Sequence, residues 1–266
     1  MTSSDHDPVS GDLARLLSTC PGRLSVAWQS SGGLGGAIDA DRLVPAASTI
    51  KVAIMLAALR SVAEQTISLD DLVPIARPRV GGSSALTEMP SVTELPLIEV
   101  LALMIVISDN DATNATIDHV GLAQIEKLLV DAGATSTRLQ RRLMDQAAID
   151  RGLQNVTTAA DLVKIMVGLR EGRLLGPTGT GQALAILRRQ QDTSGLPTYL
   201  DDQVTVANKT GMLVGLRHDV ALIERGQSWV AAAVTATDLV DGAGVDRGTA
   251  ALGVFAEIGR LVAGLA

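Results

Sequence analysis

The feature that most constrains the fold of this 266-residue sequence is the position of its strand-like segments, which lie near both ends of the chain. Near the N-terminus, residues 24–29 (LSVAWQ) have strand composition, and residues 30–36 form a turn rich in Gly and Ser. Three more strands are expected at 203–207, 219–223 and 229–235, separated by turns that contain Gly. Strands joined by short turns pair antiparallel, so both ends of the chain contribute to one antiparallel sheet.

Helical patterns fill the middle of the chain, where apolar residues recur every three or four positions. This order predicts an α/β fold of the α+β type, with an antiparallel sheet from both chain ends flanked by helices and an inserted all-helical lobe. We expect residues 1–47 and 190–266 to form the α/β lobe and residues 48–189 the helical lobe, with the active site in the cleft between them. The expected helices cover residues 13–17, 48–62, 95–107, 122–131, 159–169 and 247–261.

The composition argues against several classes of partner. Aromatic residues make up only 2% of the chain, too few for a base-stacking surface, and the net charge of −7 disfavours nucleic acid and anionic membranes. The longest apolar run, residues 95–107, contains Pro96 and Glu99, so no membrane-spanning segment is expected. A small molecule is therefore the expected partner, and the sequence leaves the oligomeric state open.

Cys20 is the only cysteine, so the chain cannot form an internal disulfide. The three histidines are not at metal-ligand spacing, and a single Cys cannot complete a zinc site, so we expect neither a metal nor another cofactor. Residues 1–8 contain two aspartates and a histidine, and no Lys or Arg, before any apolar segment, unlike a secretory signal peptide. The sequence therefore predicts a cytoplasmic protein.

The first of three short motifs is Ser-x-x-Lys, formed by Ser48 and Lys51 at the start of the helix expected over residues 48–62. Residues three apart lie on the same helix face, so the Ser48 hydroxyl and the Lys51 amine can meet. A hydroxyl beside a neutral amine is a workable pair of nucleophile and base, and the helix N-terminus favours negative charge at Ser48. Taken alone, a Ser cap followed by a solvated Lys is the simpler explanation.

The second and third motifs lie at 108–110 (Ser-Asp-Asn) and 209–211 (Lys-Thr-Gly). Ser-Asp-Asn follows the most apolar helix, where buried polar residues need hydrogen-bond partners; the alternative is a helix end at which Asn turns the chain. Lys-Thr-Gly ends an expected strand, and its Gly lets a substrate or another backbone approach closely. The alternative for this motif is an edge strand protected by Lys.

The three motifs occur together by chance with a probability on the order of 10⁻⁴, and their order and context fit one mechanism. They are the elements of active-site serine enzymes that recognise penicillin. From about Leu24 to the C-terminus the chain resembles class A β-lactamases, including the segment 108–114 around Ser-Asp-Asn and the strand that begins at His218. The resemblance implies antiparallel strands with flanking helices, and a helical lobe that carries Ser48 and Ser108.

The resemblance also implies a role for each matching residue. Ser48 is the nucleophile, Lys51 is its general base or proton relay, and Ser108 passes a proton toward the leaving group. The backbone N–H groups of Ser48 and Met212 form the oxyanion hole. Lys209 attracts a substrate carboxylate and, as a second cation, keeps the pKa of Lys51 low.

Substrate binding is assigned to further residues in the same way. Asn110 bonds the acyl-amide of the substrate, Thr210 binds its carboxylate, and Gly211 permits its close approach. Arg217 is a further candidate for the carboxylate, although a surface Arg is equally typical of that position. His218 is expected to be structural. The predicted partner is therefore a small molecule with an acyl-amide and a carboxylate.

The sequence departs from class A β-lactamases at the residue that clears the acyl-enzyme. Those enzymes carry Glu-x-x-Leu-Asn between Ser-Asp-Asn and Lys-Thr-Gly, whereas this chain has only Glu126 and Glu171 there, neither of them followed by Leu-Asn. The corresponding loop, residues 142–156, is shortened. Asp145 or Asp150 could replace the glutamate with a shorter reach, or either could simply fix the loop by bonding a backbone amide.

These observations predict a serine hydrolase that cleaves an amide or ester bond, of the β-lactam kind, through an acyl-enzyme at Ser48. The alternatives are a transacylase or esterase, a D-amino-acid amidase acting on a cytoplasmic metabolite, or a non-catalytic sensor that binds penicillin. The pocket walls are expected from loops 77–90 and 172–199, whose shape the sequence does not reveal.

Overall fold

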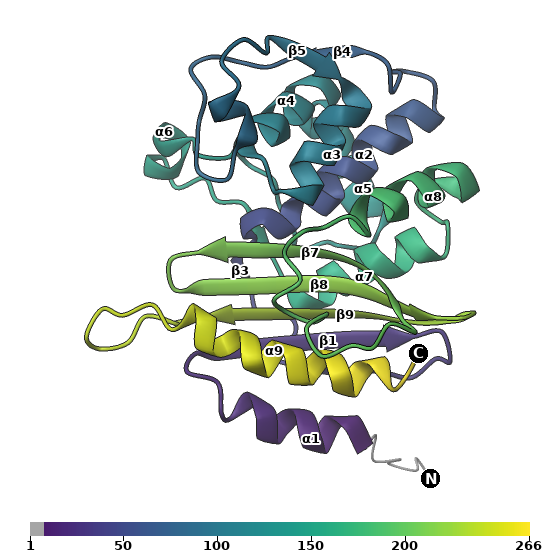
Figure 1. Ribbon diagram of the computed structural model, residues 1–266, viewed down its shortest axis with the longest axis vertical. Coiled ribbons are helices and arrows are strands. Elements are labelled where there is room, and N and C mark those ends of the chain that lie inside the picture. The colour runs from purple at the N-terminus through teal and green to yellow at the C-terminus, as the bar shows by residue number, and fades with distance from the viewer. Residues whose placement is uncertain (1–7) are drawn as a thin grey trace.

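The computed structural model describes residues 8–266, and its centre is a five-stranded antiparallel sheet with the strand order β2-β1-β9-β8-β7 (Figure 1). Strands from both ends of the chain build this sheet, which confirms the prediction. Residues 1–7, part of the segment on which the predicted localisation rests, lie outside the described residues. The strands are β1 (Arg23–Ser30), β2 (Gly35–Ile38), β7 (Thr205–Leu213), β8 (Leu216–Arg225) and β9 (Ser228–Thr237).

The C-terminal strands are longer than the apolar pattern predicts, because backbone pairing continues past the apolar residues. β7 and β8 pair as far as Leu213 and Leu216, so the Lys-Thr-Gly motif at 209–211 lies inside β7 rather than at its end. The expected turn rich in Gly is also shorter, since Gly36 belongs to β2. A Cβ at Gly36 would lie 2.2 Å from the Trp28 ring, so the strand requires Gly there.

The inserted part of the chain is mostly helical but contains three short strands, one of which pairs with a strand just before the inserted part, so the expected all-helical lobe is not purely helical. β3 (Val44–Pro45) pairs with β6 (Val156–Thr157), and β4 (Leu72–Pro74) pairs with β5 (Glu94–Pro96). The apolar helix begins at Leu97 rather than two residues earlier, because those two residues pair with β4. The helices are α1 (Pro8–Leu17), α2 (Lys51–Ala63), α3 (Leu97–Val106), α4 (Asn110–Val120), α5 (Leu122–Asp131), α6 (Gln146–Asp150), α7 (Ala159–Arg170), α8 (Gly176–Leu187) and α9 (Gly248–Ala263), with 3₁₀ turns η1 (Ala47–Ile50) and η2 (Ala85–Glu88).

Helices cover both faces of the sheet, as predicted. α9 packs against β8 and β9 with α1 beside it, and α7 packs on the other face against β1, β8 and β9. Side chains of β9 alternate accordingly, because Ala231 and Ala233 join the core with α7 whereas Ala232 and Val234 join the core with α9. The division into lobes at residues 48 and 190 stays a prediction, and α7 packs on the sheet although it lies within the expected helical lobe.

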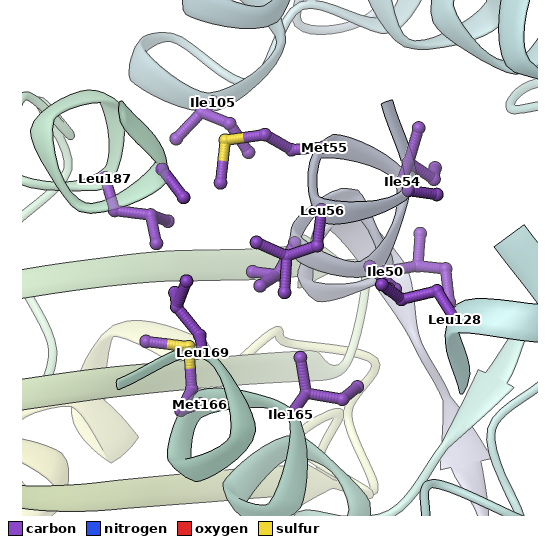
Figure 2. Packing of buried hydrophobic residues seen from close by; sticks show 14 of the residues in the cluster. Ile50, Ile54, Met55, Leu56, Ile105, Leu128, Ile165, Met166, Leu169 and Leu187 are labelled. Atoms are coloured by element: carbon purple, nitrogen blue, oxygen red, sulfur yellow. The ribbon is translucent and has the colours of Figure 1, made fainter. Parts of the chain in front are cut away.

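Helix α2 is the centre of the larger hydrophobic core, which extends from the α7 face of the sheet to the helices beyond the edge strand β7 (Figures 1 and 2). Ile54, Met55 and Leu56 are completely buried among side chains of α3, α5, α7 and α8. Because α2 is packed on all sides, its position is fixed, and so is the position of the first motif at its N-terminus. In the part of the chain that the structure describes, no helix is long and apolar enough to cross a membrane.

Candidate active site

Ser48 lies in the turn η1, immediately before α2 begins at Lys51. The preceding residue, Ala47, has a φ of 45°, a left-handed conformation that is uncommon outside Gly. Thr49 stabilises the turn, because its hydroxyl donates to the Ala46 carbonyl oxygen at 2.6 Å. Ser48 is half-buried, so it lies at a helix start and still within reach of a small molecule.

Lys51 is completely buried and makes three hydrogen bonds to the second motif. Its Nζ donates to the Ser108 carbonyl oxygen at 2.6 Å, to Ser108 Oγ at 3.1 Å and to Asn110 Oδ1 at 2.9 Å. Burial lowers the pKa of Lys51 well below its ordinary value, and the nearby Lys209 cation lowers it further, although Asp109 opposes both effects. The three motifs therefore converge on an amine whose surroundings favour its neutral form.

The segment that connects α3 to α4 holds Ser108 in an unusual conformation. Ser108 has a φ of 61°, which a non-Gly residue keeps only where the surrounding structure enforces it, often at functional sites. Asp109 is completely buried and caps α4 by accepting from the Ala112 N–H at 2.9 Å; it also accepts from the Leu86 N–H at 3.1 Å. The aspartate of the motif thus positions Ser108 and Asn110 rather than facing the cavity.

Asn110 connects the Lys51 amine to the loop after β4. Its Nδ2 donates to the Gly81 carbonyl oxygen at 3.0 Å, and its backbone N–H donates to the Ser83 carbonyl oxygen at 2.7 Å. Gly82 has a φ of 72°, and a Cβ there would lie 2.9 Å from Asn110 Nδ2, so this approach requires Gly. None of these loop residues belongs to a motif, and the sequence alone offers no signal for their individual roles.

Strand β7 brings the third motif to the first. A Cβ at Gly211 would lie 3.2 Å from the Ser48 nitrogen and 3.2 Å from the Ala47 Cβ, so this Gly allows η1 to approach the strand. Lys209 is completely buried, and its Nζ donates to the Thr210 carbonyl oxygen at 2.9 Å. Burial lowers the pKa of Lys209 to about 8, against the opposing effect of two nearby carboxylates.

A cavity of about 360 Å³ contains both serines of the motifs. Met212, whose backbone N–H is the predicted partner of Ser48 in the oxyanion hole, lines this cavity. As expected, the other walls come from the loop after β4 and from the segment before β7. The lining residues are Ser48, Ser83, Ser108, Thr210 and Met212, together with segments 106–107 and 190–192.

Two carboxylates that no motif predicts lie near the buried lysine of β7. Asp192 lines the cavity; burial alone would raise the pKa of its carboxyl, but hydrogen bonds from Ser194 and Thr210 and the lysine charge lower the pKa below its ordinary value. Asp219 is completely buried, and burial raises its pKa to about 7. Because Asp219 accepts from the Leu196 N–H at 2.9 Å, it ties the segment after Asp192 to β8.

Arg217 lies beside the main cavity rather than in its wall. Its guanidinium donates to the Leu213 carbonyl oxygen at 3.0 Å and to the Leu216 carbonyl oxygen at 2.8 Å, and it lies 3.8 Å from Asp246. The residue lines a smaller cavity of about 160 Å³, which adjoins the first at Thr210. A substrate carboxylate would reach Arg217 by entering this second cavity.

Neither aspartate considered for deacylation lines the cavity of Ser48. Asp145 caps the short helix α6, accepting from the Ala148 N–H at 2.9 Å. Asp150 accepts from Gln146 Nε2 at 2.8 Å. Each carboxylate therefore already has a structural partner in the loop between α5 and α7.

His218 is buried and contacts the backbone of the segment that precedes η1. Its Nε2 lies 2.8 Å from the Pro45 carbonyl oxygen, and the Ala236 N–H donates to Nδ1 at 3.3 Å. Burial lowers the pKa of His218 to about 4, and the Arg42 charge contributes in the same direction. With its proton on Nε2, the neutral ring donates to Pro45 and accepts from Ala236, while the Arg217 carbonyl oxygen, 2.6 Å from Nδ1, receives no proton from the ring.

Within residues 8–266, no group of three His, Cys, Asp or Glu side chains is close enough to hold a metal ion. The site holds a hydroxyl, a buried amine, a second hydroxyl and backbone N–H groups. Together these groups can form and break an acyl ester.

Comparisons with known proteins agree with this arrangement. A family model described as "Beta-lactamase enzyme family" matches residues 8–264. A β-lactamase of Rhodobacter capsulatus is 25% identical over 233 residues, covering 85% of this chain and 79% of the relative. A "Beta-lactamase regulatory protein" of Streptomyces cacaoi is 24% identical over 247 residues, covering 76% of this chain and 79% of the relative. The crystal structure of a β-lactamase from Sphaerobacter thermophilus has a TM-score of 0.85 and 29% identity, with 97% of each chain covered.

Proposed function

The chain belongs to the beta-lactamase enzyme family, and on this basis we propose that it hydrolyses an amide or ester bond of a β-lactam-like substrate through an acyl-enzyme on Ser48. Membership of the family makes the chain a hydrolase of amide bonds. The observation that carries the proposal is the buried Lys51 amine, whose three hydrogen-bond partners are uncharged. The neutral amine keeps two N–H donors, enough for the Ser108 carbonyl oxygen and Asn110 Oδ1, and gains a lone pair. Burying an amine among uncharged groups is costly for stability, but it favours the neutral form that a general base requires.

The arrangement of these groups supports the following acylation step. Lys51 takes the proton of Ser48 Oγ as that oxygen attacks the substrate carbonyl carbon, while the backbone N–H groups of Ser48 and Met212 bind the oxyanion. The proton then passes through Ser108 to the departing nitrogen or oxygen, along the 3.1 Å contact between Lys51 Nζ and Ser108 Oγ. Asn110 Oδ1 has a second lone pair available for the acyl-amide N–H of the substrate.

The charge of Lys209 gives carboxylate binding a pH dependence. Its pKa of about 8 means that the ammonium is present below pH 8 and is lost above it. Between pH 7 and 9 the protonated fraction falls about tenfold, so kcat/KM for a penicillin should fall by up to about tenfold relative to p-nitrophenyl acetate. The neutral ester is the control, because titration of Lys51 affects both substrates. A constant ratio would remove Lys209 from carboxylate binding.

Clearing the acyl-enzyme requires a base that activates water. Glu126 is an exposed residue of α5, and Glu171 follows α7, where it forms an exposed ion pair. Asp145 and Asp150 are bonded within their own loop. We therefore assign water activation to Lys51 itself, which makes deacylation the slower half-reaction.

A chromogenic cephalosporin tests this order of rates. We expect a burst of about one equivalent of product per protein molecule, followed by slow turnover, because acylation has its groups in place whereas deacylation lacks a dedicated base. Intact mass spectrometry should show the acyl adduct during the slow phase. Rapid turnover without a burst would contradict the assignment, since a well-placed base would then have to exist.

Alanine substitutions at the two aspartates identify the base. Because Asp145 is bonded at the start of α6 and Asp150 is bonded to Gln146, neither substitution should change the lifetime of the adduct. A longer-lived adduct in either variant would transfer the deacylation role to that carboxylate.

A second candidate function is supported by the name of one relative. The Streptomyces cacaoi protein is called a β-lactamase regulatory protein. A chain that is acylated without turnover would act as a penicillin sensor. An adduct that persists for hours distinguishes a sensor from a slow hydrolase, and transfer of the acyl group to an added amine would indicate a transacylase.

A further inference from the structure

A carboxylate of the protein lies where a carboxylate of the substrate is expected. Asp192 belongs to the segment between α8 and β7 and is exposed, and it lines both the cavity that contains Ser48 and the smaller cavity beside it. Thr210 and Met212 also line both cavities, so Asp192 lies where the two adjoin. No motif contains Asp192, and the proposed acylation step does not use it.

Hydrogen bonds hold the Asp192 side chain in this position. Its Oδ1 accepts from Ser194 Oγ at 2.6 Å and from the Ser194 N–H at 3.2 Å. Asn208 Nδ2 donates to the Asp192 carbonyl oxygen at 3.3 Å, which ties the segment to β7. Burial opposes ionisation, but the bonds from Ser194 and Thr210 and the Lys209 charge lower the pKa of the carboxyl below its ordinary value. The side chain is therefore negatively charged at neutral pH.

The nearby cations are less accessible to a ligand than this carboxylate. Lys209 is completely buried, its Nζ donates to a backbone carbonyl oxygen at 2.9 Å, and it lines neither cavity. Arg217 lines only the smaller cavity, and its guanidinium already donates to two backbone carbonyl oxygens. A substrate carboxylate that extends from Ser48 to Arg217 would therefore pass Asp192.

The Thr210 hydroxyl donates its proton to the same carboxylate. This hydrogen bond to Asp192 uses the single proton of the hydroxyl. A substrate carboxylate at Thr210 would need that proton, whereas the lone pairs of the hydroxyl remain able to accept. A substrate amide N–H or hydroxyl fits this arrangement, because it donates a hydrogen bond and carries no charge.

We propose that Asp192 determines specificity, because it selects against a substrate carboxylate beside Thr210 and favours an uncharged hydrogen-bond donor there, a primary amide or a hydroxyl. The inference rests on the proposed acyl-enzyme function and names its substrate class. A like charge beside a binding position rejects a ligand through repulsion in addition to the lost hydrogen bond. The Lys209 charge attracts a carboxylate through the cavity wall, and Asp192 offsets this attraction inside the cavity.

A penicillin and its primary carboxamide test the proposal with identical reacting groups. In both, Ser48 Oγ bonds to the β-lactam carbonyl carbon, the ring C–N bond breaks, and the ring nitrogen takes the proton. The quantity measured is the acylation rate constant over KM for the penicillin, divided by that for the carboxamide. Asp192→Asn keeps an acceptor oxygen for Ser194 and removes the charge, so this ratio should rise about tenfold at pH 7 and low ionic strength. An unchanged ratio would overturn the proposal.

Asp202→Asn is the matched control. Asp202 is exposed in the same segment before β7 and lines neither cavity, and its substitution removes the same charge from the protein. The ratio should stay at the parent value in this variant. An equal rise in both variants would overturn the proposal, since the net charge of the protein would then set the ratio.

Thr210→Val tests the direction of the hydrogen bond and leaves Asp192 in place, so it decides the question even if the Asp192→Asn protein does not fold. Val has nearly the shape of Thr but no hydroxyl to accept from the substrate. The carboxamide should therefore lose about tenfold more than the penicillin in its acylation rate constant over KM. A loss for the penicillin that equals or exceeds the loss for the carboxamide would overturn the proposal, because the hydroxyl would then donate to a substrate carboxylate.

Failure of the proposed function is recognised separately, as the absence of any Ser48 adduct with either compound. In that case both compounds are titrated into Ser48→Ala protein and followed by NMR, because recognition beside Thr210 does not require the serine. Adding Asp192→Asn to this variant should tighten binding of the penicillin about tenfold relative to the carboxamide. Equal changes in the two Kd values, or no binding of either compound, would overturn the proposal.

Discussion

Ser48→Ala protein is expected to form no covalent adduct with a penicillin or with a fluorophosphonate probe. Ser48 lies at the start of α2 and three residues before the buried amine of Lys51, so its hydroxyl is the one we expect to be activated. Intact mass spectrometry should therefore show complete labelling of the parent protein and none of the variant. Labelling that survives the substitution would place the nucleophile elsewhere.

Ser83→Ala is the matched control for this experiment. Ser83 lines the same cavity as Ser48, but the residue three positions later is Leu86, which offers no base. Labelling of this variant should equal that of the parent. Peptide mapping of the labelled parent should locate the probe on Ser48.

Lys51→Arg should lower the acylation rate by about 10² to 10⁴-fold. A guanidinium stays protonated at any pH at which the protein is folded, so it cannot accept the proton of Ser48, whereas the buried amine can. Single-turnover acylation by a penicillin, followed by quenching and mass spectrometry, measures this rate directly. Acylation at the parent rate would assign the base to another group.

Two further variants separate the loss of a base from damage to the fold. Lys51→Met has a similar volume without a nitrogen and should show the same loss, with a thermal midpoint that confirms a folded protein. Lys164→Arg changes a lysine that pairs with Asp161 at 3.0 Å on α7, outside the cavity lining, and should leave acylation unchanged.

The parts of the fold that sequence predicts well are governed by local interactions. The helix expected over residues 122–131 matches α5 at both ends, because its apolar periodicity and the Gly121 before it are local signals. The strands of the C-terminal sheet are found in the expected order, but their ends are extended. Pairing between β7 and β8 continues to Leu213 and Leu216, and such pairing depends on the partner strand rather than on the segment itself.

In the candidate site, too, the features that depend on neighbouring residues are predicted and those that depend on distant residues are not. Ser48 and Lys51 are three residues apart, so a single helical turn relates them, and the sequence predicts the pair. The contact between Lys51 and Ser108 joins residues 57 positions apart, and only the resemblance to a known family assigns the two residues to one reaction. The loop 172–199 was expected to form a wall of the pocket, but neither the spacing nor the resemblance predicts that the Asp192 carboxylate lies near Lys209.

The sequence by itself determined the residue types of the chemistry, the periodicity of the helices and the fact that both chain ends build the sheet. Only the tertiary structure decided that Asp145 caps α6, that Asp219 holds the segment after Asp192, and that Gly82 and Gly211 allow the backbone to close around Ser48. The physical reason is that spacing and propensity act over a few residues. Burial, close approach and the pKa of a buried amine depend on groups that packing brings together from distant parts of the chain.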